Sequence, residues 1–313
     1  MCIWNFRCTN LWLRTFPVQK KRTIMIITRL FGGLGNQMFQ YAAGRRLAHV
    51  LAVELKLDIT WLGKFESRPY ALGKFNIEEK FASKAEIAAV APTGRFGHAL
   101  ATKWPKKCPK YIQEKGFHFD PEILNLHDGV YLKGYWQSEK YFSDIAESIR
   151  REFILKTPLS GKSKELFEMI VSKQSVSIHI RRGDYVATRR TKQVHGTCGP
   201  DYYLRCVDYL KQLVKNAHFF VFSDDPEWAG DNLKQLCPAT FVDYNRAGRD
   251  YEDLLLMSRC NHHIIANSTF SWWGAWLNPK KDKIVLAPKQ WFDKKTQASV
   301  KIDDLFPPGW ILL

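Results

Sequence analysis

Paired cysteines are the first feature that this chain lacks. Its seven cysteines are an odd number, they are scattered, and no two of them stand in C-x-x-C spacing. This distribution argues against a disulfide framework and against a zinc site built from thiolates. We therefore expect free thiols and a reducing compartment.

Long apolar runs are also missing. Polar residues, among them Arg7 and Arg14, interrupt the tryptophans and leucines of residues 1–24, so no run reaches the roughly 18 residues that a membrane span needs. The segment also lacks the apolar core and cleavage site of a signal peptide. We expect residues 1–24 to be an extension outside the domains, and the protein to be cytoplasmic. A basic anchor lying at a membrane surface is the alternative interpretation of this extension.

Acidic residues are few. Lysine and arginine number 47 and aspartate and glutamate only 31, which gives a formal net charge of +16. Such an excess favours polyanions, anionic membrane surfaces or phosphorylated substrates as partners. No element alternates basic and aromatic residues as a platform for stacked bases does. We therefore expect no nucleic-acid partner, whereas peripheral contact with an anionic membrane stays open.

The apolar segments that are present predict an α/β protein. A strand from residue 25 leads into a glycine-rich loop and a helix, and residues 60–130 then show little periodicity. A further strand at 130–136 and a helix at 139–153 are expected after them. After a linker at 157–161, the pattern predicts strands and helices in alternation: strands at 175–180, 218–222, 262–266 and 283–287, helices at 201–217, 226–236, 250–260 and 271–277. This alternation is typical of a parallel sheet. We expect domains at 25–157 and 158–313.

Polar clusters stand directly after three of the predicted strands. They read H-I-R-R-G-D at 179–184, S-D-D-P at 223–226 and N-S-T-F-S at 267–271. In an open parallel sheet these positions share one edge, where ligands bind. The sequence therefore predicts a binding site at the edge of the second sheet.

The first cluster has two interpretations. Either the strand only reaches the surface, with Arg182 and Asp184 paired in water, or Arg181 binds a doubly charged anion such as a diphosphate. Adjacent residues of an extended segment point to opposite sides, so we expect one arginine to meet the ligand and the other to pair with Asp184. His179 shares the side of Arg181, and is either a ligand contact or a packed histidine bonded to backbone.

The other two clusters suit an anionic nucleotide. Asn267 to Ser271 precede a helix, and the N–H groups at a helix start bind anions. Asp224 and Asp225 are a metal pair, a helix cap or a reader of guanine; no histidine stands near them to complete a metal shell, which argues against a metal. One aspartate is expected to cap the helix and the other to read guanine.

The glycine-rich loop G-G-L-G-N-Q at 32–37 resembles a phosphate loop. It lacks the Lys-Ser/Thr pair of a P-loop kinase. Its glycines, Gly33 and Gly35 among them, let backbone approach a ligand closely. The side chains of Asn36 and Gln37 are then expected to bond sugar hydroxyls or a phosphate.

In combination, these motifs resemble the α-1,2-fucosyltransferases of glycosyltransferase family 11. The matching stretches are G-G-L-G-N-Q-M-F-Q-Y-A at 32–42, H-I-R-R-G-D-Y-V at 179–186, F-S-D-D-P at 222–226 and N-S-T-F-S-W-W-G-A-W-L at 267–277. The resemblance implies a metal-independent GT-B-like fold, with two Rossmann-like domains facing across a cleft. The N-terminal domain would serve mainly the acceptor, and the C-terminal domain would bind GDP-β-L-fucose.

The resemblance also implies roles for individual residues. Arg181 would bind the diphosphate and stabilise the leaving group, Asp224 would contact guanine, and Asn36 would touch the fucose or the β-phosphate. The expected donor-binding set is Gly33, Gly35, Asn36, Gln37, His179, Arg182, Asp224, Asn267, Ser268, Thr269, Ser271 and Trp272. Related enzymes carry a glutamate beyond the double arginine, but this chain reads A-T-R-R at 187–190. The neighbouring candidates for a general base are Asp184, which we expect, and His195.

The implied reaction transfers fucose to the 2-hydroxyl of a terminal β-galactoside with inversion, and needs no cofactor. A lipid-linked oligosaccharide for a surface polysaccharide is the expected acceptor. The alternatives are transfer of another GDP-sugar or formation of another linkage, and a GDP-sugar-binding protein without activity. No residue read from the sequence chooses the acceptor.

Overall fold

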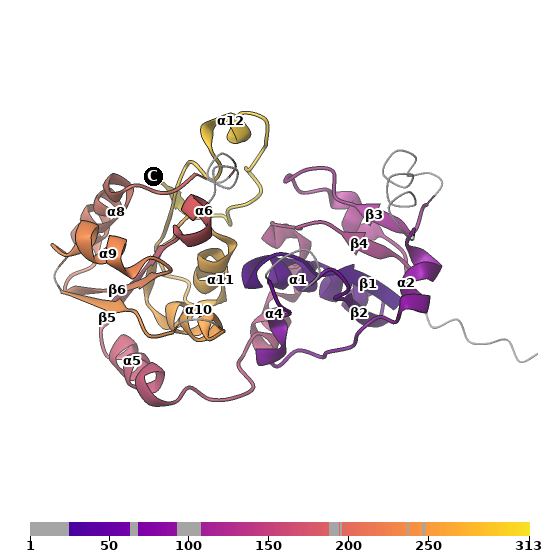
Figure 1. The fold of residues 1–313 in the computed structure, drawn as a ribbon, viewed down its shortest axis with the longest axis horizontal. Helices are drawn as coiled ribbons and strands as arrows, with labels where there is room; N and C mark the ends of the chain where they lie inside the picture. The colour runs from indigo at the N-terminus through magenta and orange to yellow at the C-terminus, as the bar shows by residue number, and fades with distance from the viewer. Residues whose placement is uncertain are drawn as a thin grey trace, which may run out of the picture.

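The computed structural model describes residues 25–62, 68–92, 108–187, 194, 196–236, 238–245 and 248–313, with the backbone alone for residues 184 and 187. The extension expected at residues 1–24 lies outside these ranges. The described chain forms two halves, each built on its own parallel sheet (Figure 1). The expected two-domain GT-B architecture is confirmed in this arrangement.

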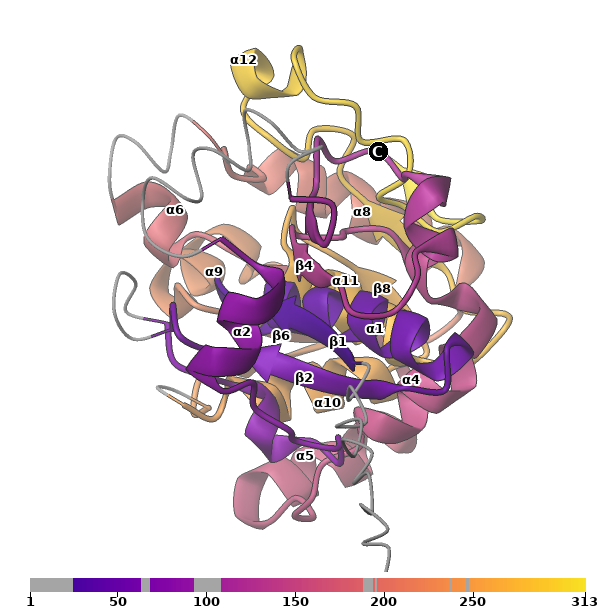
Figure 2. The same ribbon diagram turned by 90° about the vertical axis from the view of Figure 1, so that its right-hand side faces the viewer.

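The N-terminal half contains a four-stranded sheet in the order β2-β1-β4-β3, with every pair parallel. Its strands are β1 (Met25–Arg29), β2 (Glu54–Asp58), β3 (Tyr111–Gln113) and β4 (Tyr131–Lys133). Its helices are α1 (Leu34–Val50), α2 (Lys84–Val90) and α4 (Ala146–Glu152), with 3-10 turns η1 (Leu72–Lys74), η3 (Pro121–Asn125), η4 (Glu139–Tyr141) and η5 (Ser143–Ile145). Helix α1 lies between this sheet and the other half, whereas α2 lies on the outer side (Figures 1 and 2).

The C-terminal half contains a six-stranded sheet in the order β10-β9-β8-β5-β6-β7, again parallel throughout. Its strands are β5 (Gln174–Ile180), β6 (Ala217–Ser223), β7 (Ala239–Val242), β8 (His262–Ile264), β9 (Val285–Ala287) and β10 (Ile311–Leu312). Its helices are α5 (Gly161–Val171), α6 (Gly183–Ala187), α8 (Pro200–Leu213), α9 (Pro226–Leu233), α10 (Asp250–Arg259), α11 (Thr269–Leu277) and α12 (Lys294–Gln297).

The predicted strands of the C-terminal half are confirmed as β5, β6, β8 and β9. Strands β7 and β10 and helix α5 were not predicted. The helix expected at 139–153 is instead two 3-10 turns followed by α4, and the loop after β5 turns directly into α6. The expected domain boundary at 157/158 falls between α4 and α5, in the connection that joins the two halves.

The halves meet where α1 packs on α11, in one continuous apolar core. The ring of Phe39 on α1 lies 4.4 Å from that of Trp272 and 4.9 Å from that of Trp273. Phe142 stacks on Trp273 at 5.4 Å. The tryptophans are almost fully buried, because α11 is sandwiched between its own sheet and α1. Aromatic pairs with this geometry add to the apolar burial.

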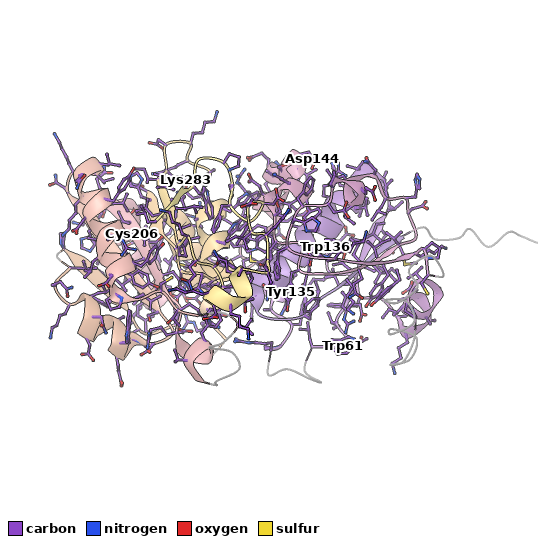
Figure 3. All side chains as sticks on the ribbon, turned by 90° about the horizontal axis from the view of Figure 1, so that it is seen from above. Trp61, Tyr135, Trp136, Asp144, Cys206 and Lys283 are labelled. Atoms are coloured by element: carbon purple, nitrogen blue, oxygen red, sulfur yellow. The ribbon has the colours of Figure 1, made fainter. Side chains whose placement is uncertain are left out.

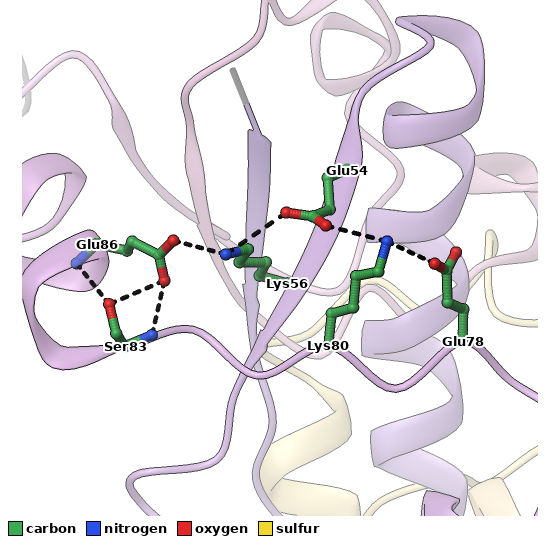
Figure 4. Close-up of polar contacts among 6 residues, drawn as sticks. All are labelled: Glu54, Lys56, Glu78, Lys80, Ser83 and Glu86. Atoms are coloured by element: carbon green, nitrogen blue, oxygen red, sulfur yellow. Dashed lines mark hydrogen bonds and ion pairs between the residues drawn. The ribbon is translucent and has the colours of Figure 1, made fainter. Parts of the chain in front are cut away.

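Charged side chains hold α2 and the segment before it against β2 (Figure 4). Lys56 lies 2.6 Å from Glu86 and 3.5 Å from Glu54, and Glu54 lies 3.0 Å from Lys80. Ser83 and Glu86 form a reciprocal capping box at the start of α2. Exposed ion pairs contribute little singly, but together these contacts hold α2 and the segment before it beside β2, on the outer face of the N-terminal sheet.

None of the helices in the described ranges is long and apolar enough to cross a bilayer.

Candidate functional site

The strand order of the second sheet creates a crevice between the loops after β5 and β8. From β5 the chain moves outward through β6 and β7, then returns to β8 on the other side of β5. The loops after β5 and β8 therefore diverge, which is where ligands bind in open α/β sheets. The hydroxyl of Tyr185 on α6 donates to the carbonyl of Asn267 at 3.3 Å and joins the two loops.

Two arginines at the end of β5 pair with two aspartates at the end of β6. Arg181 lies 2.9 Å from Asp224, and the Nε atom of Arg182 lies 3.2 Å from Asp225. The guanidinium of Arg182 also lies over the ring of Trp228, 4.4 Å from its centroid. The partner expected for Arg182 was Asp184. The structure shows Asp225 as a partner of Arg182, because parallel pairing sets the end of β5 beside the end of β6. The side chain of Asp184 lies outside the described atoms, so its pairing with Arg182 stays a prediction.

The two aspartates have different tasks. Asp225 accepts a hydrogen bond from the backbone N–H of Trp228 and caps α9, as predicted for one of the pair. Asp224 accepts instead from the backbone N–H of Arg182 at 2.8 Å. A Cβ atom at Gly183 would lie 2.9 Å from a carboxylate oxygen of Asp224, so glycine permits this close approach. Asp224 therefore holds the loop that carries Arg181 and Arg182 in place by contacts with both residues.

His179 is packed beneath the same loop. It is 5% exposed, its ring lies 5.4 Å from that of Phe270, and its Nδ1 atom has no hydrogen-bond partner within the described chain. Burial, with Arg181 as a second cause, lowers the pKa of His179 to about 3. The ring is therefore neutral at physiological pH. One interpretation of His179 was a packed histidine bonded to backbone, and its Nδ1 atom forms no such bond within the described residues.

The 267–272 segment is largely committed to internal contacts. Ser268 caps α11 through the N–H of Phe270. Asn267 donates to the carbonyl of Trp291 at 3.1 Å, Ser271 donates to the carbonyl of Ser268 at 3.2 Å, and Trp272 donates to the carbonyl of Leu305 at 2.8 Å. The side chains of Asn267, Ser271 and Trp272 are buried. The amide, hydroxyl and indole of these three residues thus each have a partner inside the protein, and the donor contact expected of them stays a prediction.

The glycine-rich loop reaches across to the start of α11. A Cβ atom at Gly35 would lie 2.5 Å from the carbonyl carbon of Thr269, and the carbonyl of Gly35 accepts from the indole of Trp273 at 3.0 Å. Gly35 therefore serves packing between the halves, and its expected contact with a donor stays a prediction. Gly33 is the N-cap of α1 and has open space where a Cβ would stand.

The two amides of this loop also differ. Gln37 is fully buried and bonds Gly32, Pro69 and Ala71, which gives its side chain a structural role; the sugar or phosphate contact expected of it stays a prediction. Asn36 accepts through Oδ1 from Gln137 and from Thr269, each at 3.0 Å. Any contact of Asn36 with a ligand is thereby left to its Nδ2 group.

Asp184 lies on α6, but its side chain is outside the described atoms, as is all of His195. Their expected roles as a base stay predictions. Within the described chain, no cluster of three or more His, Cys, Asp or Glu is arranged to hold a metal ion.

Two carboxyl groups with raised pKa values were not among the residues that the sequence predicted. Burial raises the pKa of Glu114, which accepts from the backbone N–H groups of Tyr135 and Trp136, to about 7. Burial likewise raises the pKa of Asp253, which accepts from Asn245, to about 7. Glu114 is buried against the segment after β4, and Asp253 on α10 against the segment before that helix, so no local pattern could have found them.

A pocket of about 470 Å³ adjoins the crevice through Asn267, at the carboxyl ends of β8 and β9. Arg205, Lys289 and Gln290 line it. Arg181 and Asp224 are not among the residues that line this pocket. We place the candidate site at the arginine pair and not in this pocket, since the switch point and the paired charges coincide there.

Comparison with known proteins identifies the family. The chain matches glycosyl transferase family 11 over residues 7–313. It belongs to that family. Family 11 relatives include an alpha-1,2-colitosyltransferase of Escherichia coli, 36% identical over 92% of this chain and 98% of the relative. The O-antigen biosynthesis glycosyltransferase WbnK of Escherichia coli is 32% identical over 91% and 99%. The human galactoside alpha-(1,2)-fucosyltransferase 1 is 28% identical over 77% and 68%.

Solved structures agree with this family 11 assignment at the level of the fold. The structure of NodZ alpha-1,6-fucosyltransferase soaked with GDP-fucose has a TM-score of 0.51 at 14% identity, covering 82% of this chain and 94% of that one. A GT-B glycosyltransferase fold is therefore established, and the expected membership of family 11 is confirmed.

Proposed function

We propose that this family 11 enzyme is a galactoside 2-α-L-fucosyltransferase. It transfers L-fucose from GDP-β-L-fucose to the 2-hydroxyl of a terminal β-galactoside, with inversion and without a metal, in the synthesis of a surface polysaccharide or O-antigen. The observation that carries the proposal is the position of Arg181, which lies at the switch point of the second sheet with its guanidinium held by Asp224.

In this proposal the diphosphate of GDP binds the guanidinium of Arg181, in competition with Asp224. A planar guanidinium presents two parallel N–H groups to phosphate oxygens. The same contact stabilises the charge that develops on GDP as the anomeric bond breaks. The acceptor 2-hydroxyl attacks from the opposite face of the sugar, and Asp184 takes its proton.

Guanine recognition falls to Asp224. In the structure without GDP, its two oxygens accept from Arg181 and from the N–H of Arg182, and the first of these bonds is the one for which the diphosphate competes. An ionised carboxylate has about four acceptor positions, so two are left for the ring N–H and the amino group of guanine. Asp224→Asn is expected to lower the preference for GDP over IDP, which lacks that amino group. An unchanged ratio of the two dissociation constants would remove Asp224 from guanine recognition.

Colitose is a second candidate for the transferred sugar, because one relative is an alpha-1,2-colitosyltransferase. Colitose is fucose without its 3-hydroxyl group. The decisive test offers GDP-fucose and GDP-colitose in turn, in EDTA, with β-galactosides such as lactose and N-acetyllactosamine. Fucose found on the galactose 2-hydroxyl supports the proposal, and transfer of colitose alone replaces it with the second candidate. Binding of GDP-sugar without any product would make the chain a binding protein.

The acceptor side is assigned to residues 25–157 and the donor side to residues 158–313. The acceptor is proposed to be lipid-linked, with the basic chain resting on anionic lipid. Co-sedimentation with anionic vesicles is expected to fall as salt is raised. Binding that is equal for neutral and anionic vesicles would contradict the membrane contact.

A further inference from the structure

All four strands of the N-terminal sheet end on a polar or charged residue. Arg29, Asp58, Gln113 and Lys133 are the last residues of β1, β2, β3 and β4. Arg29 stands beside Asp58 in the register of β1 and β2, and Gln113 stands beside Lys133 in that of β3 and β4. The ammonium of Lys133 bonds the amide of Gln113 at 3.4 Å. The carboxyl edge of this sheet therefore carries its own polar cluster.

This cluster lies on the outer face of the sheet. Side chains alternate along a strand, so Arg29 shares the face of Ile27, which packs with Tyr111 and Tyr131 away from α1. Trp61, which is 38% exposed, covers the guanidinium of Arg29, 3.7 Å from its ring centroid. Figure 3 shows Trp61 at a different part of the N-terminal half from Tyr135 and Trp136.

The positive charge of Arg29 is not balanced by an ion pair within the described residues. Arg29 is 4% exposed and its Nε atom has no hydrogen-bond partner. Its neighbour Asp58 is already engaged, accepting from the Tyr131 hydroxyl at 2.5 Å and from the Thr60 N–H at 2.8 Å. A buried charge with an unbonded N–H is costly unless a partner compensates it.

Lys133 adds a second positive charge. Burial, and then the charge of Arg29, lowers the pKa of Lys133, and burial lowers the pKa of Arg29 despite the nearby Asp58. The fold thus partly buries two cations, Arg29 and Lys133. The carboxylate beside Arg29, that of Asp58, already accepts two hydrogen bonds. An anion with two or more oxygens would supply the missing acceptors.

We propose that Arg29 and Lys133 form a subsite for an anionic group of the acceptor, a carboxylate or a phosphate at a distance from the sugar that is glycosylated. This inference rests on the proposed transferase function, and it names the acceptor class as acidic. The donor diphosphate is already assigned to Arg181 in the other half. Arg29 precedes the glycine-rich loop whose Asn36 contacts Thr269, so the subsite is on the same connection that leads to the donor side.

The test compares three acceptors that share one β-galactoside: neutral N-acetyllactosamine, the same disaccharide extended with glucuronate, and the same disaccharide carrying a reducing-end phosphate. The wild-type enzyme is expected to favour at least one acidic acceptor by about tenfold in kcat/KM, the size of one charge-assisted hydrogen bond. The acid that is preferred identifies the source, an acidic sugar or a glycosyl phosphate. Equal kcat/KM for all three overturns the subsite.

Two variants and a control assign any preference to residues. Arg29→Met and Lys133→Met should each reduce the ratio of acidic to neutral kcat/KM, whereas Lys84→Met, which removes one exposed charge from α2, should leave it unchanged. An arginine kept for ligand binding is a buried charge without a partner, which lowers the stability of the fold. Arg29→Met is therefore expected to match or exceed the thermal stability of the wild type. A strongly destabilised Arg29→Met together with a Lys133→Met that keeps the full ratio would overturn the proposal and leave Arg29 a structural residue.

Ligand binding at the subsite can also be measured without catalysis. Calorimetric titration of the GDP-loaded enzyme with the two acidic disaccharides should show binding that Lys133→Met weakens and Lys84→Met does not. Such binding without transfer of fucose or colitose would retain the subsite while rejecting the proposed function. Transfer to neutral galactosides with no such binding would reject the subsite alone.

Discussion

The hydroxyl of Thr269 donates to the side-chain oxygen of Asn36 across 3.0 Å, although 233 positions separate the two residues in the chain. Asn36 stands in the first turn of α1 and Thr269 in the first turn of α11. The helix starts of both halves therefore meet directly.

Loss of this bond should loosen the junction. Thr269→Val keeps the shape of the side chain but removes the donor, and is expected to cost about 1 kcal/mol of unfolding free energy. Thr269→Ser keeps the hydroxyl and should retain more of that stability. Denaturant midpoints measure both. If the valine and serine variants prove equally stable, the bond contributes nothing.

Glycine at position 35 is required by the contact between the helices. Gly35→Ala would place a methyl group against the backbone of Thr269 and Phe270, so it should destabilise the fold by about 1–3 kcal/mol. Gly230→Ala in α9 is the matched control, because a Cβ there meets nothing within 4 Å. That control should be neutral or slightly stabilising, since alanine favours helix. Similar unfolding curves for the two variants would contradict the close packing.

Arg181 should control GDP affinity. Arg181→Ala is expected to weaken GDP binding by about tenfold or more, and Arg181→Lys should restore little, because an ammonium cannot form the two-pronged contact. Arg259→Ala, which removes an exposed arginine from the same half, serves as the control. Titration calorimetry gives the affinities and circular dichroism checks the fold. GDP affinity retained in a folded Arg181→Ala protein would overturn the assignment.

Two histidines should each make stability fall as the pH drops from about 6.5 towards 5, whereas Glu114 and Asp253, with pKa values raised to about 7, act in the opposite direction over this range. His179 has its pKa lowered to about 3, and burial also lowers that of His263, so both stay neutral in the folded protein. The unfolded chain takes up their protons below about pH 6.5, and each group then removes about 1.4 kcal/mol per pH unit. The stability they contribute is complete above pH 6.5.

His179→Leu should change the slope of stability against pH by about one proton, so that less stability is lost as the pH falls, whereas replacing the exposed His127 with Asn should not change the slope. Denaturant titrations between pH 5 and pH 7 give the slopes. A slope for His179→Leu that equals the wild-type slope would mean that His179 is protonated in the folded protein.

Local patterns in the sequence were enough to locate the candidate site. Strands followed by H-I-R-R-G-D, S-D-D-P and N-S-T-F-S placed these loops at one sheet edge, and Pro226 marked Asp225 or its neighbour as a helix cap. These features depend on apolar periodicity and on backbone hydrogen bonds within a few residues, which the order of residues specifies directly.

Tertiary structure alone decided which polar side chains are left to meet a ligand. Asn36 and Gln37 are neighbours with the same kind of side chain, yet Gln37 is sealed by Gly32, Pro69 and Ala71, and Asn36 spans the two halves. Arg182 pairs with Asp225 from the neighbouring strand, and Arg29 lies beneath Trp61 without an ion pair among the described residues. Each outcome depends on segments far apart in the chain, because a buried polar group must take whichever partner the packed halves bring within reach.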